Sequence, residues 1–124
     1  MARIGLVDDD LSVRRAVGRL LRVNGYSCVT YESAEVALTD PALLQMSCII
    51  IDIQLGGMNG FEFRDRLDAL GVHIPRLFIT AHVGPDLPGH LGDSVLLIKP
   101  FEEEQLIASI KRSIGPVNSD SPQP

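Results

Sequence analysis

The chain has 124 residues, 45% of them hydrophobic and 22% charged, and its formal net charge is −5. This length fits one domain around one core, and an acidic balance without a basic stripe excludes direct nucleic-acid binding by this segment. No apolar run approaches the ~20 residues of a membrane span, and the sequence reaches Asp8 too early for a signal-peptide core, so we expect no membrane association and a cytoplasmic location.

The first part of the chain alternates an apolar run, an amphipathic segment and a second apolar run. Residues 3–7 predict a strand that ends in Asp8-Asp9-Asp10, and residues 11–24 predict a helix with one apolar stripe. The opposite face of this helix carries Arg14, Arg15, Arg19 and Arg22. This basic face is either solvated or a docking surface for an acidic partner. Residues 26–31 predict a second strand, and Ser33 is expected to cap a short helix.

The run Cys48-Ile49-Ile50-Ile51-Asp52 is apolar along its whole length and ends in one carboxylate. Such a run, bounded by turn residues, is typical of a buried parallel strand. The helix after it is expected to begin near Asn59 or Gly60 and to end at Gly71. Residues 77–79 and 95–98 predict two further strands, which end in Thr80 and in Lys99-Pro100.

The segment of residues 82–93 is rich in glycine and proline, which leaves little room for a helix interior. We expect a short or distorted helix there, or a loop. A last helix is predicted over residues 102–114, with three glutamates at its start and Lys111-Arg112 at its end. We therefore expect one domain over residues 1–115 and a disordered tail or linker stub over residues 116–124.

Strands that alternate with helices predict a parallel sheet with right-handed crossovers. The carboxyl ends of its strands share one edge, where open α/β sheets bind ligands. Three carboxylates, of Asp8, Asp9 and Asp52, would crowd there and repel one another unless they are protonated, solvated or bound to a cation. Magnesium suits such an oxygen-rich site, whereas Asp10 is better placed to cap the following helix.

Taken together, the acids after the first and third strands, Thr80 and the Lys99-Pro100 step resemble the receiver domain of bacterial two-component response regulators. The resemblance implies a flavodoxin-like (βα)5 fold with a five-stranded parallel sheet in the order 2-1-3-4-5, and a cis Lys99-Pro100 peptide bond. It also implies phosphorelay signal transduction, in which a histidine kinase or histidine phosphotransfer protein phosphorylates Asp52. No enzymatic activity is expected beyond Mg²⁺-dependent self-phosphorylation and self-dephosphorylation.

The same resemblance implies a role for each residue of the site. Asp9 and Asp52 would bind Mg²⁺ directly, Asp8 through water, and the backbone carbonyl of Gln54 would complete the protein ligands. Lys99 and the hydroxyl of Thr80 would each contact a phosphoryl oxygen.

A switch at Thr80 would change an output surface, residues 82–101, that binds an unidentified downstream protein. Two positions depart from the family pattern. Leu96 stands where most receivers have an aromatic residue, and Gly56 stands where proline is common. The site is therefore expected to be complete and the output relay to be altered.

Two other functions stay open at this point. A receiver-like interaction domain that acts without phosphorylation would account for the altered output region, although the phosphorylation residues are complete. A phosphatase of the haloacid-dehalogenase type would use Asp8, in the pattern Asp8-x-Asp10-x-Ser12, as its nucleophile. That class normally has a longer chain with a cap domain, which argues against it.

Overall fold

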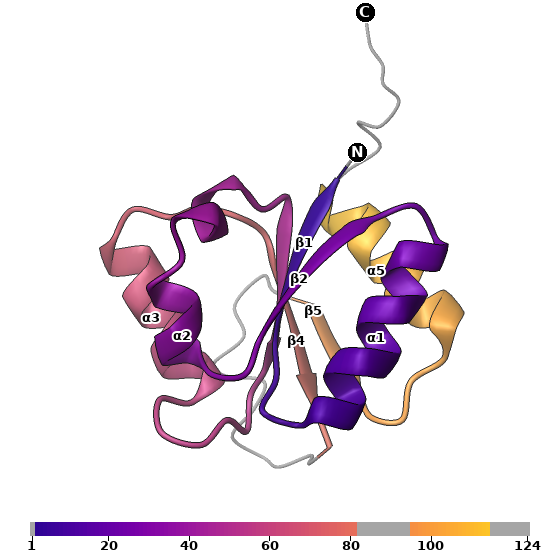
Figure 1. Ribbon diagram of the computed structural model, residues 1–124, viewed down its shortest axis with the longest axis horizontal. Helices are drawn as coiled ribbons and strands as arrows, with labels where there is room; N and C mark the ends of the chain where they lie inside the picture. The colour runs from indigo at the N-terminus through magenta and orange to yellow at the C-terminus, as the bar shows by residue number, and fades with distance from the viewer. Residues whose placement is uncertain (1, 82–94, 115–124) are drawn as a thin grey trace, which may run out of the picture.

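The computed structural model describes residues 2–81 and 95–114 (Figure 1). Its five strands pair in parallel in the order β2-β1-β3-β4-β5. They are β1 (Arg3–Val7), β2 (Ser27–Tyr31), β3 (Cys48–Asp52), β4 (Arg76–Thr80) and β5 (Val95–Ile98). The predicted flavodoxin-like sheet and its strand order are therefore confirmed.

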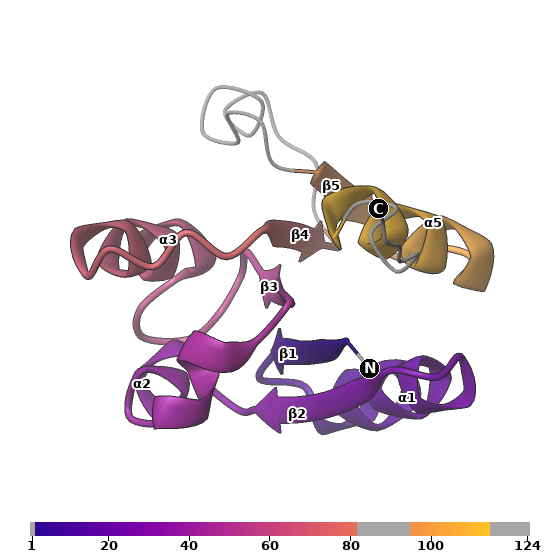
Figure 2. The ribbon, with the colours of Figure 1, turned by 90° about the horizontal axis from the view of Figure 1, so that it is seen from above.

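Helices cover both faces of the sheet, as Figures 1 and 2 show. One layer holds α1 (Leu11–Val23) and α5 (Glu103–Ile114), and the other holds α2 (Ala34–Leu38), the 3-10 helix η1 (Pro41–Gln45) and α3 (Gly60–Ala69). The predictions for residues 82–93 and for the tail over residues 116–124 lie outside the described residues. Within the described ranges, no helix is long and apolar enough to cross a membrane.

The central strand β3 explains why the core has two parts. All five of its residues are buried, and alternate side chains of a strand point to opposite faces of the sheet. Ile49 and Ile51 therefore join the core beneath α2 and α3, whereas Cys48 and Ile50 join the core beneath α1 and α5. This double burial accounts for the uninterrupted apolar run, and it delivers Asp52 to the sheet edge.

The two cysteines are free thiols. Cys48 is buried as part of the predicted strand β3, and burial raises the pKa of its thiol to about 12. Cys28 is only partly buried. Both residues pair with Ile4 from opposite sides of β1, so a whole strand separates them.

Side-chain caps begin the helices next to the sheet edge. Asp10 accepts a hydrogen bond from the Ser12 amide at 2.8 Å and caps α1, as predicted. Ser33 likewise caps α2. Asn59 begins α3 in a reciprocal capping box with Glu62. These caps fix where each helix starts relative to the strand that precedes it.

Gly60, the first residue of α3, lies against the end of β3. A Cβ atom at this position would be 2.7 Å from the Asp52 carbonyl oxygen and 2.8 Å from Ile53 Cα. Because backbone atoms cannot rotate away, we expect Gly60→Ala to lower the free energy of unfolding by about 2 to 3 kcal/mol in urea denaturation. Gly56→Ala is the matched control, since its Cβ would meet only Asp9 Oδ2, at 3.9 Å. Equal losses in the two variants would contradict this account.

Candidate functional site

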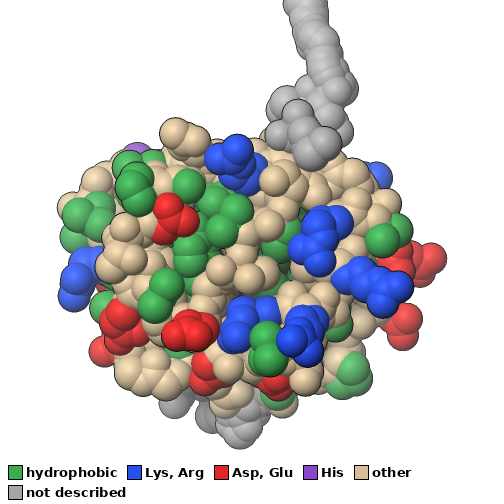
Figure 3. All heavy atoms as spheres, viewed as in Figure 1, with side chains coloured by type: hydrophobic (Ala, Val, Ile, Leu, Met, Phe, Trp, Pro, Cys, Tyr) green, Lys and Arg blue, Asp and Glu red, His purple; other side chains and the backbone are tan. Residues whose placement is uncertain are grey.

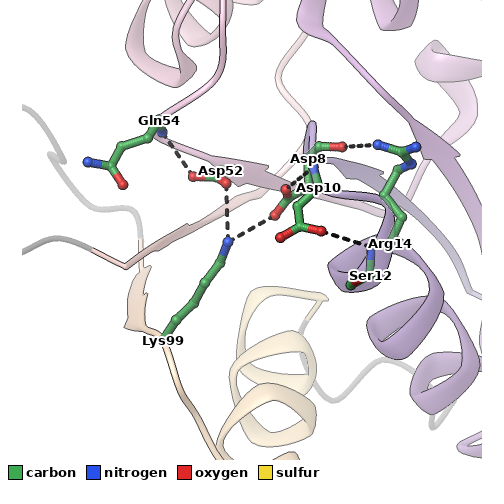
Figure 4. A network of polar contacts seen from close by, with 7 residues as sticks. All are labelled: Asp8, Asp10, Ser12, Arg14, Asp52, Gln54 and Lys99. Carbon is green, nitrogen blue, oxygen red and sulfur yellow. Dashed lines mark hydrogen bonds and ion pairs between the residues drawn. The ribbon is translucent and has the colours of Figure 1, made fainter.

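The carboxyl ends of the strands bring the predicted site residues to one edge of the sheet. Asp8 follows β1, Asp52 ends β3, Thr80 ends β4 and Lys99 follows β5. In Figure 4 the side chains of Asp8, Asp52 and Lys99 point toward one another. Thr80 is buried, and its carbonyl accepts a hydrogen bond from the Lys99 amide at 2.7 Å. The fold thus places these four residues together, as the parallel topology predicted.

Three carboxylates form the acidic part of the site. Oxygen atoms of Asp8, Asp9 and Asp52 all lie within 4.8 Å of one another. Asp8 is fully buried and Asp52 is 5% exposed, whereas Asp9 is exposed. One oxygen of Asp8 accepts a hydrogen bond from the Asp10 amide, and one of Asp52 accepts from the Gln54 amide, both at 2.9 Å. The second oxygen of each buried carboxylate is left for a positive charge.

Lys99 supplies that positive charge. Its Nζ lies 3.1 Å from Asp8 Oδ2 and 3.2 Å from Asp52 Oδ2, so one ammonium group joins the two buried carboxylates (Figure 4). The Lys99-Pro100 peptide bond is cis, which confirms the expectation from the sequence. Three carboxylates facing one ammonium group leave the site with an excess of negative charge.

Burial and charge shift the pKa of two groups in this cluster. Burial raises the pKa of the Asp8 carboxyl, and the charge of Asp52 adds to the rise; hydrogen bonds from the Asp10 amide and Lys99 offset it only in part. Burial alone would lower the pKa of Lys99, but its contacts with Asp8 and Asp52 outweigh burial and raise it. Lys99 is therefore protonated at neutral pH, and a further cation near Asp8 would favour the ionised carboxylate.

The donor atoms at this edge fit a hard divalent ion. All three side chains offer carboxylate oxygen, the ligand that Mg²⁺ prefers, and the exposed Asp9 leaves one side of the cluster open to solvent. Asp8 is buried with a raised pKa, so a second positive charge would stabilise its ionised form. The residues present therefore match the predicted magnesium site in chemistry and in proximity.

Two further residues were assigned to the site from the sequence, Gln54 and Leu96, and only Gln54 contacts one of the clustered carboxylates. The Gln54 amide contacts Asp52, while its side chain points away from the cluster in Figure 4. Leu96 is partly buried against the core beneath α2 and α3. It pairs with Phe78, two residues before Thr80, so it lies along β5 and not at the sheet edge where the carboxylates meet.

Two contacts of the site were not predicted. Arg14 donates a hydrogen bond from Nη1 to the Asp8 carbonyl at 2.7 Å, which fixes the backbone between β1 and α1. Glu35, on α2, accepts a hydrogen bond from the Met58 amide in the loop after β3. The sequence offered only a weak signal for the first, since Arg14 lies one helical turn after the cap Asp10, and none for the second.

Arg15, Arg19 and Arg22 remain exposed on α1, and none of them forms an ion pair with another described residue. Figure 3 shows basic side chains gathered on the face of the molecule that α1 covers. This concentration of unpaired positive charge contrasts with the net charge of −5 of the chain. The sequence left open whether this face is only solvated or binds a partner.

The order of elements and the residues at the sheet edge agree with a known family. A family model described as the response regulator receiver domain matches residues 4–111. The chain belongs to the receiver domain family. Receiver domains act in two-component signal transduction and are signalling domains, not enzymes of the usual kind, so the dehalogenase-type phosphatase is set aside.

Individual relatives agree with this assignment. Nodulation protein W of Bradyrhizobium diazoefficiens is 33% identical over 114 residues, which cover 88% of this chain and 49% of that protein. Response regulator protein TodT of Pseudomonas putida is 33% identical over 116 residues, which cover 90% of this chain and 50% of that protein. This receiver domain thus spans about half the length of these curated relatives.

Solved structures show the same architecture. Chemotaxis protein CheY4 of Vibrio cholerae has a TM-score of 0.81 and 30% sequence identity, and the match covers 91% of this chain and 98% of that one. A response regulator receiver protein from Burkholderia phymatum has a TM-score of 0.77 and 34% identity, with 92% and 95% of the two chains covered. Proteins of receiver-domain size therefore match this chain along nearly their whole length.

Proposed function

We propose that this receiver domain accepts a phosphoryl group on Asp52 from a histidine kinase or a histidine phosphotransfer protein in the cytoplasm. The observation that carries the proposal is the position of Lys99, whose Nζ lies between Asp8 and Asp52 at 3.1 and 3.2 Å. A cation held there is in place to neutralise an incoming phosphoryl group. The proposed domain covers residues 1–115, and residues 116–124 are a tail or the start of a linker.

In the proposed transfer, a carboxylate oxygen of Asp52 attacks phosphorus. The bond between phosphorus and the donor's imidazole nitrogen breaks, and its electron pair stays on that nitrogen, so an aspartyl phosphate and a free histidine result. Lys99 moves its charge toward a phosphoryl oxygen, and the Thr80 hydroxyl donates a hydrogen bond to another. Most of the catalytic effect then comes from positioning and charge neutralisation.

Magnesium would be held directly by Asp9, Asp52 and the Gln54 carbonyl, and through water by Asp8. When bound, the ion supplies positive charge to the carboxylates and to the transferred phosphoryl group. The chain's own contribution is to offset part of the rise that burial causes in the pKa of Asp8, through the Asp10 amide and Lys99, and to hold Asp52 through the Gln54 amide. Asp9, the exposed acid, would offer its carboxylate to the ion at the solvent-facing side of the cluster.

The switch would begin at Thr80. A phosphoryl group adds about −1.5 to −2 charges and strong acceptor oxygens, which would draw the buried Thr80 hydroxyl toward Asp52. Residues 82–101 follow Thr80 in the chain and would present the changed surface to a downstream protein. Leu96 stands where most receivers have an aromatic residue. A movement of Leu96 would therefore alter packing against its neighbour Phe78, with no aromatic ring at this position to change orientation.

The experiment that tests this function measures intact mass after incubation with acetyl phosphate, with and without Mg²⁺. We expect one phosphoryl group to be added only when Mg²⁺ is present, and peptide mapping to place it on Asp52. An absence of adduct after rapid quenching would overturn phosphorylation. It would favour the receiver-like interaction domain that acts without phosphate, for which Leu96 is the motivating residue.

The arginine face of α1, defined by Arg15, Arg19 and Arg22, is proposed to dock the phosphodonor protein. We expect Arg19→Glu to slow phosphotransfer from that donor roughly fivefold to tenfold at low salt, because repulsion of an acidic partner lowers the association rate. The reaction with acetyl phosphate should be unchanged. The control is Arg66→Glu, an exposed position on α3 in the other layer; equal slowing by both variants would exclude a docking role for α1.

A further inference from the structure

The loop between β3 and α3 carries Gln54 and Gly56 past the acidic cluster, and it has a contact from a distant part of the chain. Glu35, in the first turn of α2, accepts a hydrogen bond at Oε2 from the Met58 amide at 3.0 Å. Gly57 has φ +70°, and a Cβ atom there would lie 2.9 Å from the same Oε2. The carboxylate of Glu35 therefore lies directly against the backbone of the loop.

The two ends of this loop are held by other contacts. At its start, the Gln54 amide donates to Asp52 Oδ1 at 2.9 Å. At its end, Asn59 and Glu62 form the capping box of α3. Among the described residues, Glu35 is the one side chain from outside this loop and α3 that hydrogen-bonds to the middle of the loop. Without it, residues 55–58 would be held by their ends, by the buried Leu55 and by the partly buried Met58, which packs against the core beneath α2 and α3.

The middle of the loop is also the part that approaches the acids. A Cβ atom on Gly56 would lie 3.9 Å from Asp9 Oδ2, so the loop backbone passes beside the exposed acid of the cluster. A shift of the loop would therefore move the Gln54 carbonyl and Gly56 relative to Asp9. Glu35 contacts the same stretch of backbone one and two residues further on, at Gly57 and Met58.

The ionisation state of the Glu35 carboxyl strengthens its hydrogen bond to the loop. Hydrogen bonds from the Met58 amide and from its own backbone amide lower the pKa of the Glu35 carboxyl, so it is ionised at neutral pH. A charged acceptor forms a stronger hydrogen bond than a neutral one. The cap of α2 by Ser33, which accepts from the Val36 amide at 3.0 Å, fixes the helix turn from which Glu35 extends.

We propose that Glu35 is a positioning residue, which pins the loop of residues 54–58 against α2 and thereby sets the place of the Gln54 carbonyl and Gly56 beside Asp9. The loop restraint follows from the contacts of Glu35 alone. Its consequence for Mg²⁺ and for phosphorylation of Asp52 rests on the proposed function.

The direct test is hydrogen exchange of the Met58 amide, measured by NMR in the full chain. We expect Glu35→Ala to speed exchange at Met58 about tenfold, the effect of losing one charge-assisted hydrogen bond. Glu35→Gln should give an intermediate rate, because its side-chain carbonyl still accepts. Glu32→Ala, an exposed acid just before α2, is the matched control and should leave the rate unchanged.

The second readout is the affinity for Mg²⁺ by calorimetry. We expect Glu35→Ala to weaken binding severalfold and Glu35→Gln to restore part of it. An unchanged Met58 rate in Glu35→Ala, an unchanged Mg²⁺ affinity, or faster exchange spread equally over β3 and α3 would overturn the proposal, since the last would show a general loss of stability. If the wild type takes up no phosphoryl group while Met58 exchange responds as expected, the proposed function fails and the loop restraint stands.

Discussion

Asp52→Asn is expected to abolish phosphorylation and to leave the fold intact, which is the largest effect expected of any single change in the domain. The amide has the shape of the carboxylate, and its oxygen can still accept a hydrogen bond from the Gln54 amide, which lies 2.9 Å from Asp52 Oδ1. It lacks the charged oxygen that attacks phosphorus. Intact mass after reaction with acetyl phosphate and Mg²⁺ should therefore show no adduct, and circular dichroism should match that of the wild type.

Two further variants make this result specific. Asp65→Asn changes an exposed carboxylate on α3 and should be phosphorylated like the wild type. Asp8→Asn keeps the nucleophile but removes a buried charge beside Lys99, so we expect a slower reaction and a weaker response to Mg²⁺. An adduct that persists in Asp52→Asn would show that another residue is the acceptor.

Lys99→Met is expected to act on stability as well as on chemistry. The methionine fills similar space but leaves Asp8, fully buried, and Asp52, whose side chain is 7% exposed, without their cation. Removing one partner of a buried ion pair destabilises a protein by several kcal/mol. Because Lys99 is 22% exposed, we expect a smaller loss, about 2 kcal/mol in the free energy of unfolding by urea at neutral pH without Mg²⁺. Phosphorylation should slow by orders of magnitude.

The pH dependence of this loss follows from Asp8. Its pKa is already raised in the wild type by burial and by the charge of Asp52, and removing Lys99 raises it further. A carboxyl whose pKa is raised on folding costs stability as pH rises through the folded value. The deficit of Lys99→Met should therefore be largest at neutral pH and shrink in acid, where Asp8 is protonated.

Mg²⁺ should also reduce the deficit, since it replaces part of the missing charge. Lys111→Met, at an exposed position on α5, is the control and should lose little stability. A deficit for Lys99→Met that is the same at every pH, with or without Mg²⁺, would show that packing and not charge is responsible.

The sheet and the acidic cluster were accessible from sequence because both depend on strong local patterns. A strand buried on both faces has to be apolar throughout, as the run ending in Asp52 is. Once the strands are known to be parallel, their carboxyl ends share one edge. The nearness of Asp8, Asp9, Asp52 and Lys99 then follows from their positions after the strands, and the structure confirms it.

The supporting contacts were not accessible in this way. The hydrogen bond from Met58 to Glu35 joins residues 23 positions apart in sequence, and it depends on how α2 lies against the loop. No periodicity or spacing in the sequence indicates how α2 lies against this loop. The same holds for Arg14, which was assigned to the exposed arginine face but donates to the Asp8 carbonyl.

The division of the core by β3 has a consequence for how such domains diversify. Cys48 and Ile50 contact one helical layer while Ile49 and Ile51 contact the other, so the sheet separates two sets of neighbours that share few side chains. Substitutions in separate sets have nearly additive effects. The layer of α1 can therefore acquire a new surface chemistry while α2 goes on holding the loop beside Asp9. If α1 docks the phosphodonor and Asp52 accepts its phosphoryl group, as proposed, partner choice and phosphate chemistry can evolve as separate traits within one small domain.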